Sequence, residues 1–65
     1  MDKVRFISLT YTDGTKTYVK ADVIVQIEEV KDKSAVYIIG SDTPLYVKER
    51  ADKILARMEA ITIAW

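Results

Sequence analysis

The segment that most constrains the fold is residues 23–39, which predicts two β-strands joined by a polar turn. β-Branched residues occupy nearly every apolar position of both arms, and such residues favour strands. Residues 36–39 are apolar on both faces, which is typical of a strand in the centre of a sheet or against a partner subunit. The turn at residues 31–34 contains no glycine. We therefore predict a loop of about four or five residues built on a type I turn, and not a tight two-residue turn.

A second hairpin is predicted before this one. Residues 4–11 alternate as a strand does, and Phe6 falls on the wetter face, where we expect the helix or a neighbouring molecule to cover it. Asp13-Gly14 predicts the turn, because Gly14 can adopt the positive φ angle that a tight hairpin demands. Residues 16–21 form the predicted return strand.

The connections are marked by breaks in the alternation. We predict a short kinked 3₁₀-type connection at residues 22–25, with Asp22 as its cap. Residues 40–44 concentrate turn-forming residues and predict a loop, and residues 45–47 predict a short fifth strand. A helix that begins at Thr43 remains an alternative to this strand.

From residue 48 the apolar residues recur every three or four positions, which predicts one helix over about residues 48–62. Its apolar stripe comprises Ala51, Ile54, Leu55, Met58, Ile61, Thr62 and Trp65. Glu49 and Lys53 are four apart and predict an ion pair on this helix. No Ser, Thr, Asp or Asn caps the start, so the first turn needs a tertiary contact. Residues 61–65 also alternate like a strand, so a helix end, a strand and a subunit contact all remain open for them.

The chain is short enough to be one small domain over residues 1–65. A core of this size alone supplies no more than about 3 to 5 kcal/mol, and such domains usually need a further stabilising device. The sequence has neither Cys for a disulfide nor His or Cys for a zinc site. We therefore expect a homo-oligomer, with a well-packed monomer as the alternative.

The charges balance, with ten basic and ten acidic residues. A net charge of zero supplies no field that would gather nucleic acid or an anionic membrane, so we expect nucleic-acid binding to be weak at most. The apolar runs are shorter than the roughly 18 to 20 residues that span a bilayer, and no charged-then-apolar leader opens the chain. We expect a cytoplasmic protein without membrane insertion.

Reactive groups are scarce. The absence of His and Cys removes the common general base, the thiolate nucleophile and the usual transition-metal ligands. Ser8, Ser34 and Ser41 lack a nucleophile-elbow motif, and two glycines cannot build a phosphate-binding loop of either standard pattern. Glu28 and Glu29 are adjacent in a predicted strand, so they point to opposite faces and cannot share a proton or a metal ion. We expect no enzyme activity, no cofactor and no metal.

Two features could serve binding. Four tyrosines are many for one small sheet, and exposed aromatic residues can anchor a partner or stack on bases, although cross-strand packing is the simpler interpretation. The basic residues of the helix alternate with acidic ones, which predicts a solvated, salt-bridged face. The candidate interaction surface comprises Tyr18, Tyr37, Tyr46, Ile63 and Trp65.

A pattern of turn and core residues runs through residues 6–61. It comprises Ile7, Leu9, Thr10, Asp13, Gly14, Ala21, Asp22, Val23, Ile24, Ile27, Glu28, Val36, Ile38, Gly40, Val47, Lys48, Glu49 and Ile54. In these residues the chain resembles the FlbD-type small flagellar accessory proteins. Lys20 and Arg50 depart from the pattern, which favours Asn and Ser there. The resemblance implies a non-enzymatic role that supports the flagellar motor, without small-molecule chemistry.

Together these observations predict an α+β fold, in which a strongly bent antiparallel sheet of about five strands, within about residues 4–47, carries one C-terminal helix over a face or an end. An SH3-like partial barrel would satisfy this description. The predicted function is a non-catalytic module that binds another protein. The alternatives are a phage or mobile-element inhibitor or sponge, which binds a host protein or a small nucleotide ligand, and a weak nucleic-acid-binding module.

Overall fold

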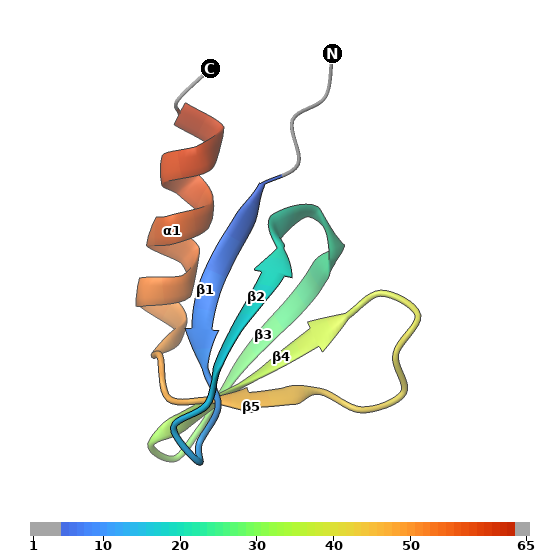
Figure 1. Ribbon diagram of the computed structural model, residues 1–65, viewed down its shortest axis with the longest axis vertical. Coiled ribbons are helices and arrows are strands. Elements are labelled where there is room, and N and C mark those ends of the chain that lie inside the picture. The colour runs from blue at the N-terminus through green and yellow to red at the C-terminus, as the bar shows by residue number, and fades with distance from the viewer. Residues whose placement is uncertain (1–4, 64–65) are drawn as a thin grey trace.

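The computed structural model of the protein describes residues 5–63, with side chains for residues 5–59. These residues form β1 (Phe6–Thr10), β2 (Lys16–Lys20), β3 (Ile24–Val30), β4 (Lys33–Ile38), β5 (Leu45–Val47) and α1 (Ala51–Ile63), with a 3₁₀ helix (Ala21–Val23) between β2 and β3. Five strands are thus followed by a helix (Figure 1), which confirms the predicted α+β class.

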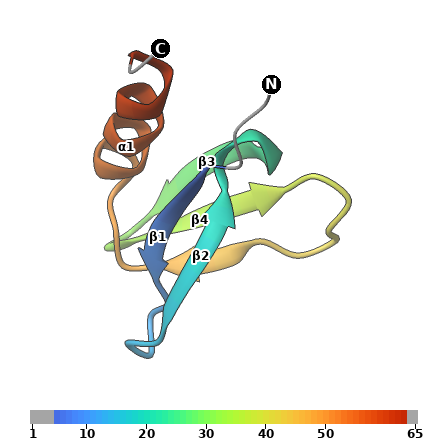
Figure 2. The same ribbon diagram turned by 45° about the horizontal axis from the view of Figure 1, so that its top comes forward.

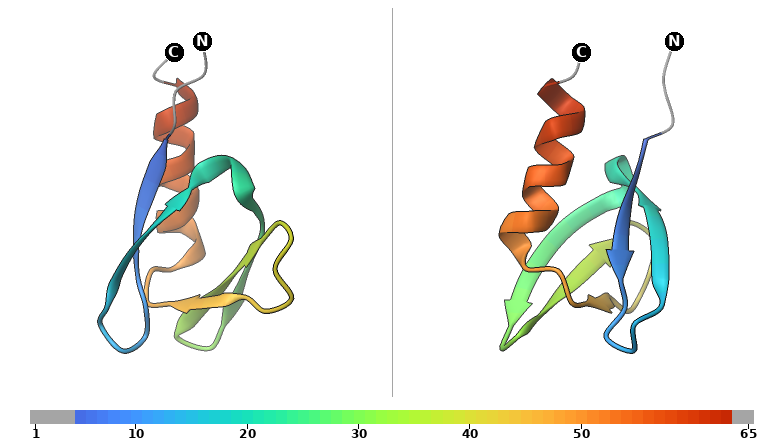
Figure 3. Two further views of the ribbon diagram at one scale, coloured as in Figure 1. Left: turned by 45° about the vertical axis from the view of Figure 1, so that its right-hand side comes forward. Right: turned by 60° about the vertical axis from the view of Figure 1, so that its left-hand side comes forward.

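The strands form two antiparallel sheets, β1–β2 and β3–β4–β5. The predicted single bent sheet is divided, yet the two parts meet where β1 ends. There Tyr11 forms an isolated bridge with Val47, and the Lys48 N–H donates to the Thr10 carbonyl oxygen at 2.8 Å. Figure 3 shows the strands curving around a shared interior. The SH3-like partial barrel stays a prediction.

The core lies between the two sheets and α1. Leu9 of β1, Val36 of β4, Val47 of β5 and Ile54 of α1 are fully buried and belong to one apolar cluster. The two sheets and the helix therefore bury their apolar faces against one another. As predicted, β4 is the central strand of its sheet.

The Asp13-Gly14 turn is confirmed. Gly14 has a φ angle of +97°, and its N–H donates to the Tyr11 carbonyl oxygen at 2.9 Å. The Asp13 carboxylate accepts a hydrogen bond of 2.9 Å from the Thr15 N–H. This bond lowers the pKa of Asp13, because it stabilises the ionised form.

The turn between β3 and β4 differs from the predicted four- or five-residue loop. Val30 pairs directly with Lys33, so only Lys31 and Asp32 connect the strands and the prediction was wrong. Lys31 adopts the positive φ angle that the turn requires, +57°. A left-handed conformation costs a residue with a side chain about 1 kcal/mol. The Lys31 carbonyl oxygen accepts a 2.6 Å hydrogen bond from Nη1 of Arg50, which holds the turn to the segment before α1.

Two predictions near the first sheet need correction. The kink after β2 is confirmed as the 3₁₀ helix, but Asp22 lies inside it, and the capping position belongs to Lys20, which makes no side-chain capping bond. Phe6 is 54% exposed, so the helix leaves more than half of it uncovered, and its cover by a neighbouring molecule stays a prediction. The predicted fifth strand is confirmed as β5, in place of a helix that begins at Thr43.

The helix begins at Ala51, three residues later than predicted. Glu49 consequently lies outside the helix, and the predicted Glu49–Lys53 pair is wrong. The tertiary contact that the first turn was expected to need is present, because the Ala51 N–H donates to Oε2 of Glu29 at 3.1 Å. The helix extends to Ile63, whereas the Ile63 side chain and all of Trp65 lie outside the described part of the chain.

Candidate functional site

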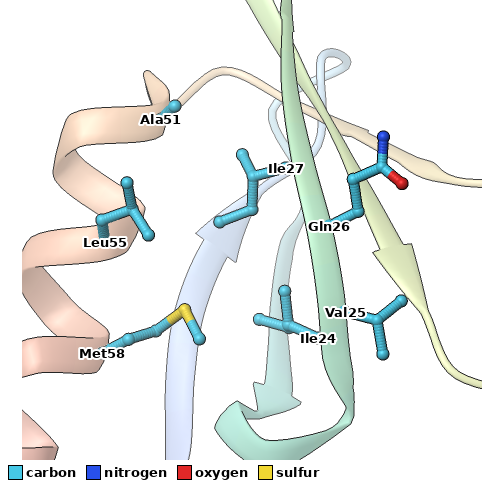
Figure 4. A pocket seen from close by; sticks show the side chains of 7 residues that line it. All are labelled: Ile24, Val25, Gln26, Ile27, Ala51, Leu55 and Met58. Atoms are coloured by element: carbon cyan, nitrogen blue, oxygen red, sulfur yellow. The ribbon is translucent and has the colours of Figure 1, made fainter.

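An apolar groove of about 230 Å³ lies between β3 and α1 (Figure 4). It is defined by four consecutive strand residues and three helix residues, and six of these seven residues are apolar. Its residues are Ile24, Val25, Gln26, Ile27, Ala51, Leu55 and Met58.

A β-bulge shapes the strand wall of the groove. Ile24 pairs with Ile38 and Gln26 pairs with Tyr37, so Val25 is an extra residue in β3. Because an extra residue reverses the alternation of side chains, Ile24 and Ile27 face the same side although they are three apart. Figure 4 shows both pointing toward α1, while the Val25 and Gln26 side chains point away.

Ala51, Leu55 and Met58 form the helix wall of the groove, next to the buried core residue Ile54. Ile54 is fully buried in the core, whereas its neighbour Leu55 is 50% exposed. Adjacent helix residues are about 100° apart around the axis, so Ile54 faces the core while Leu55 faces the groove. Asp52 and Glu59 flank Leu55 at the i−3 and i+4 positions, and both are exposed.

A first set of polar contacts holds the start of α1 against the β3–β4 hairpin. Nη2 of Arg50 forms a 3.1 Å ion pair with Oε1 of Glu29. The other carboxylate oxygen of Glu29 accepts from the first N–H of α1. Because Glu29 is in β3 and Ala51 opens α1, these bonds fix one end of the groove.

A second set centres on Glu49, whose side chain is 12% exposed. Its carboxylate accepts hydrogen bonds from the Thr10 N–H at 2.8 Å and the Thr10 hydroxyl at 2.9 Å. Nη1 of Arg57 lies 3.6 Å from the same carboxylate and also donates to the Ser8 carbonyl oxygen. The buried Ser34 hydroxyl donates to the Glu49 carbonyl oxygen at 2.6 Å.

These contacts set the ionisation of Glu49. Burial raises its pKa, but the two Thr10 bonds and the nearby Arg57 charge more than offset burial and leave the pKa below its ordinary value. Glu49 is therefore a carboxylate that the fold holds ionised between β1 and α1, and its oxygens are occupied by structural donors.

The three predicted interaction tyrosines do not line the groove, while the Ile63 side chain and Trp65 lie outside the described part of the chain. Tyr37 and Tyr46 lie on neighbouring strands, and Tyr46 is paired with Ala35, two residues from Tyr37. They therefore share the outer face of the β3–β4–β5 sheet. Tyr18 is 65% exposed on the other sheet, so the structure brings two of these tyrosines together and leaves the third apart.

The outer tyrosines have their own partners. The Tyr37 hydroxyl donates to Oε1 of Glu28 at 3.1 Å, and this bond raises the pKa of Tyr37. Nζ of Lys33 lies 5.0 Å from the centre of the Tyr46 ring, within the range of a cation–π contact. These contacts are consistent with cross-strand packing of the tyrosines.

A second, more polar depression of about 290 Å³ is lined by Thr12, Asp32, Lys33 and Lys48. The carboxylate of Asp32 opposes the two lysine charges, so the depression offers an anion a net charge of only one. Among the described residues, no three acidic side chains gather as a metal site would require. The apolar groove is therefore the stronger candidate site.

The sequence placed Ala51, Leu55 and Met58 in the apolar stripe of the helix and Ile24 and Ile27 among the turn and core residues, and it predicted no groove between them. The helix pattern carried no signal for the groove, because adjacent apolar residues such as Ile54 and Leu55 are normal within one wide apolar stripe. The bulge at Val25 did have a signal, because the three-residue spacing of Ile24 and Ile27 breaks the strand alternation, but this break was assigned to the 3₁₀ connection at residues 22–25.

Fold and site together define a small α+β domain with an exposed apolar groove on a rigid frame. The chain matches no protein-family model, no curated protein and no solved structure. Within the described residues, no helix has the length and apolar character needed to cross a membrane.

Proposed function

We propose that the protein is a non-catalytic interaction module that binds a partner protein in the groove between β3 and α1. The observation that carries the proposal is the half-exposed Leu55 at the mouth of an apolar groove. Its helix is held in place by the Glu29 bond to the first N–H of α1 and by the Glu49 bonds to Thr10. Exposed apolar side chains on a fixed frame bind with little loss of conformational freedom.

The size of the groove favours protein side chains over a free small molecule. Pockets for drug-sized ligands usually measure about 300 to 1,000 Å³ and contain a few converging polar groups. This groove is smaller, about 230 Å³, and Gln26 supplies its only polar side chain among the described lining residues, pointing away from the helix. It therefore suits one or two apolar side chains of a larger partner, which disfavours the nucleotide-sponge alternative.

The surroundings of the groove also disfavour nucleic acid. Asp52 and Glu59 border it on the helix, and Glu28 lies on the strand that forms its other wall. Carboxylates repel a phosphate backbone. The resemblance to FlbD-type proteins makes a flagellar-motor component the first partner to test, and a host protein bound by a phage or mobile-element inhibitor the second.

A homo-oligomer remains part of the proposal, because a chain of 65 residues gains substantial stability from association. Light scattering after size exclusion measures the mass of the assembly in solution. A strict monomer at every concentration would overturn this part.

Leu55→Glu tests the proposed function. Immobilised protein is incubated with lysate of the source cell, and the proteins retained are identified by mass spectrometry and purified for direct binding. Partners that bind the unaltered protein should be lost with Leu55→Glu, because a charge would then occupy the groove. Ile39→Glu is the matched control, since Ile39 is 65% exposed in the turn after β4.

Circular dichroism confirms that both variants are folded. Partners that bind the Leu55→Glu variant as well as the unaltered protein would refute the groove as the binding site. If Tyr46→Ser caused the loss of those partners instead, the binding site would be the outer sheet face that carries Tyr37 and Tyr46.

A further inference from the structure

We infer that the groove takes an extended, basic peptide segment, which adds to β3 as a further antiparallel or parallel strand and places an apolar side chain against α1. The inference rests on the proposed function and specifies the chemistry of the partner.

The open edge of β3 is the first argument. The strand order is β3–β4–β5, so β3 pairs with β4 on one side and, among the described residues, with no strand on the other. Ile24, Val25, Gln26 and Ile27 all line the groove although two of their side chains point away from it. The main chain of β3 must therefore form part of the groove wall. Unpaired main-chain groups of an edge strand bind an extended peptide by strand addition.

The free edge of β2 lacks these features. Strand β2 is also at the edge of its sheet, but it carries Lys16 and Lys20, both exposed. Lysines on an edge strand discourage pairing with another chain. Strand β3 contains neither lysine nor proline, and the apolar groove runs beside it. Its bulge at Val25 interrupts regular pairing, so the regular stretch at residues 26–30 is where a strand would be added. Edge and groove together select β3 as the position for an added strand.

Charge is the second argument. The four helix neighbours of Leu55 are Ala51 and Met58, which line the groove, and Asp52 and Glu59, which border it. The nearby arginines are engaged elsewhere, Arg50 with Glu29 and Arg57 with Glu49. The border is therefore acidic without a neutralising cation in the interactions described, and it complements lysine or arginine in the incoming segment.

The small size of the groove argues against a second copy of this chain as the occupant. A stable dimer interface buries about 800 Å² on each partner, roughly a sixth of the 4767 Å² accessible surface of the described protein. A groove of about 230 Å³ accommodates a short segment and not an interface of that size. A second copy could also pair its own β3 with this edge, but it would bring a second acidic border of Asp52 and Glu59, whereas a basic peptide complements the border already present.

A random peptide library displayed on phage tests the inference directly. The full-length protein selects binders, and enriched sequences are synthesised and measured by calorimetry. We expect apolar residues at alternate positions with lysine or arginine between them, because side chains of a strand alternate between its faces. Hydrogen exchange followed by NMR should then show newly protected amides in β3, since an added strand bonds to its free edge.

Three variants locate the binding. Leu55→Glu should weaken binding of the selected peptide about tenfold or more, as expected for the loss of a central apolar contact. Glu59→Lys should weaken it several-fold and reduce its salt dependence, because it removes one of the acidic neighbours of Leu55. Asp42→Lys is the matched charge control, since residues 39–44 form a loop that projects away from α1 (Figure 2).

The outcomes separate this inference from the proposed function. Selected peptides with apolar residues at helical spacing, or binding that Leu55→Glu abolishes without protection of β3 amides, would overturn strand addition and leave the groove as an interaction site. Failure to enrich any peptide would count against both. A dimer that Leu55→Glu dissociates would identify a second copy as the occupant and also overturn the inference.

Discussion

Replacing Glu49 by glutamine should destabilise the protein, because this side chain joins β1 to the segment that leads into α1. The Glu49 carboxylate is 12% exposed and accepts bonds of 2.8 and 2.9 Å from the Thr10 N–H and hydroxyl. Glutamine has nearly the same shape and keeps one acceptor oxygen. It loses the negative charge, one acceptor and the attraction to Arg57, which lies 3.6 Å away.

The expected cost follows from the bonds that change. A hydrogen bond to a charged group contributes about 1.5 to 3 kcal/mol, so the loss of one such bond should lower the free energy of unfolding by about 2 kcal/mol. At roughly 0.05 to 0.15 kcal/mol per residue, a chain of this length has about 3 to 10 kcal/mol in total. For a domain of this size, about 2 kcal/mol corresponds to a fall in Tm of roughly 8 to 16 °C.

The pH dependence has a definite sign. Because the folded protein holds the pKa of Glu49 below its ordinary value, the associated stability is present above about pH 4.3, the ordinary pKa of glutamate. It is lost as the pH falls through the lower, folded-state pKa. The difference in stability between the unaltered protein and Glu49→Gln should therefore be largest near neutral pH and shrink as the pH falls through the folded-state pKa of Glu49.

Urea denaturation at several pH values measures this difference. Glu59→Gln is the matched control, because Glu59 is exposed on α1 and its change should stay within about 0.5 kcal/mol. A double-mutant cycle of Glu49→Gln with Thr10→Val should give a coupling energy of about 1 kcal/mol or more. If Glu49→Gln matched the control at every pH, the anchoring role of Glu49 would be refuted.

Four further substitutions test other contacts. Gly14→Ala should lower the free energy of unfolding by about 1 kcal/mol, whereas Lys31→Gly should raise it by roughly 0.5 kcal/mol, because both positions have positive φ angles, which glycine adopts readily. Urea midpoints that moved in the same direction for both variants would contradict this. Glu28→Gln should lower the raised pKa of Tyr37 toward its ordinary value, measured by ultraviolet absorbance titration, and an unchanged pKa would exclude their bond as the cause. Glu29→Ala should cost about 1 kcal/mol by removing the acceptor at the start of α1, with thermal unfolding as the measurement and an unchanged Tm as the contrary result.

The features that sequence predicted correctly are those set by neighbours along the chain. The Asp13-Gly14 turn follows from the one residue type that tolerates its backbone angles. The central position of β4 follows from apolar residues on both of its faces, and the α+β class follows from the change of period near residue 48. The missing cap before α1 likewise indicated that a distant residue must supply one.

Only the tertiary structure decided where distant elements meet. The tight turn at Lys31 is adopted because pairing of β3 with β4 leaves two residues to connect them, whatever their own preference. Glu49 lies outside the helix because the N–H and hydroxyl of Thr10, thirty-nine positions away in the sequence, both donate to its carboxylate. The groove exists because a bulge and the axis of α1 expose Leu55 while Ile54 fills the core. Spacing along the chain specifies which side chains can share a face, but only packing determines which of those faces is left uncovered.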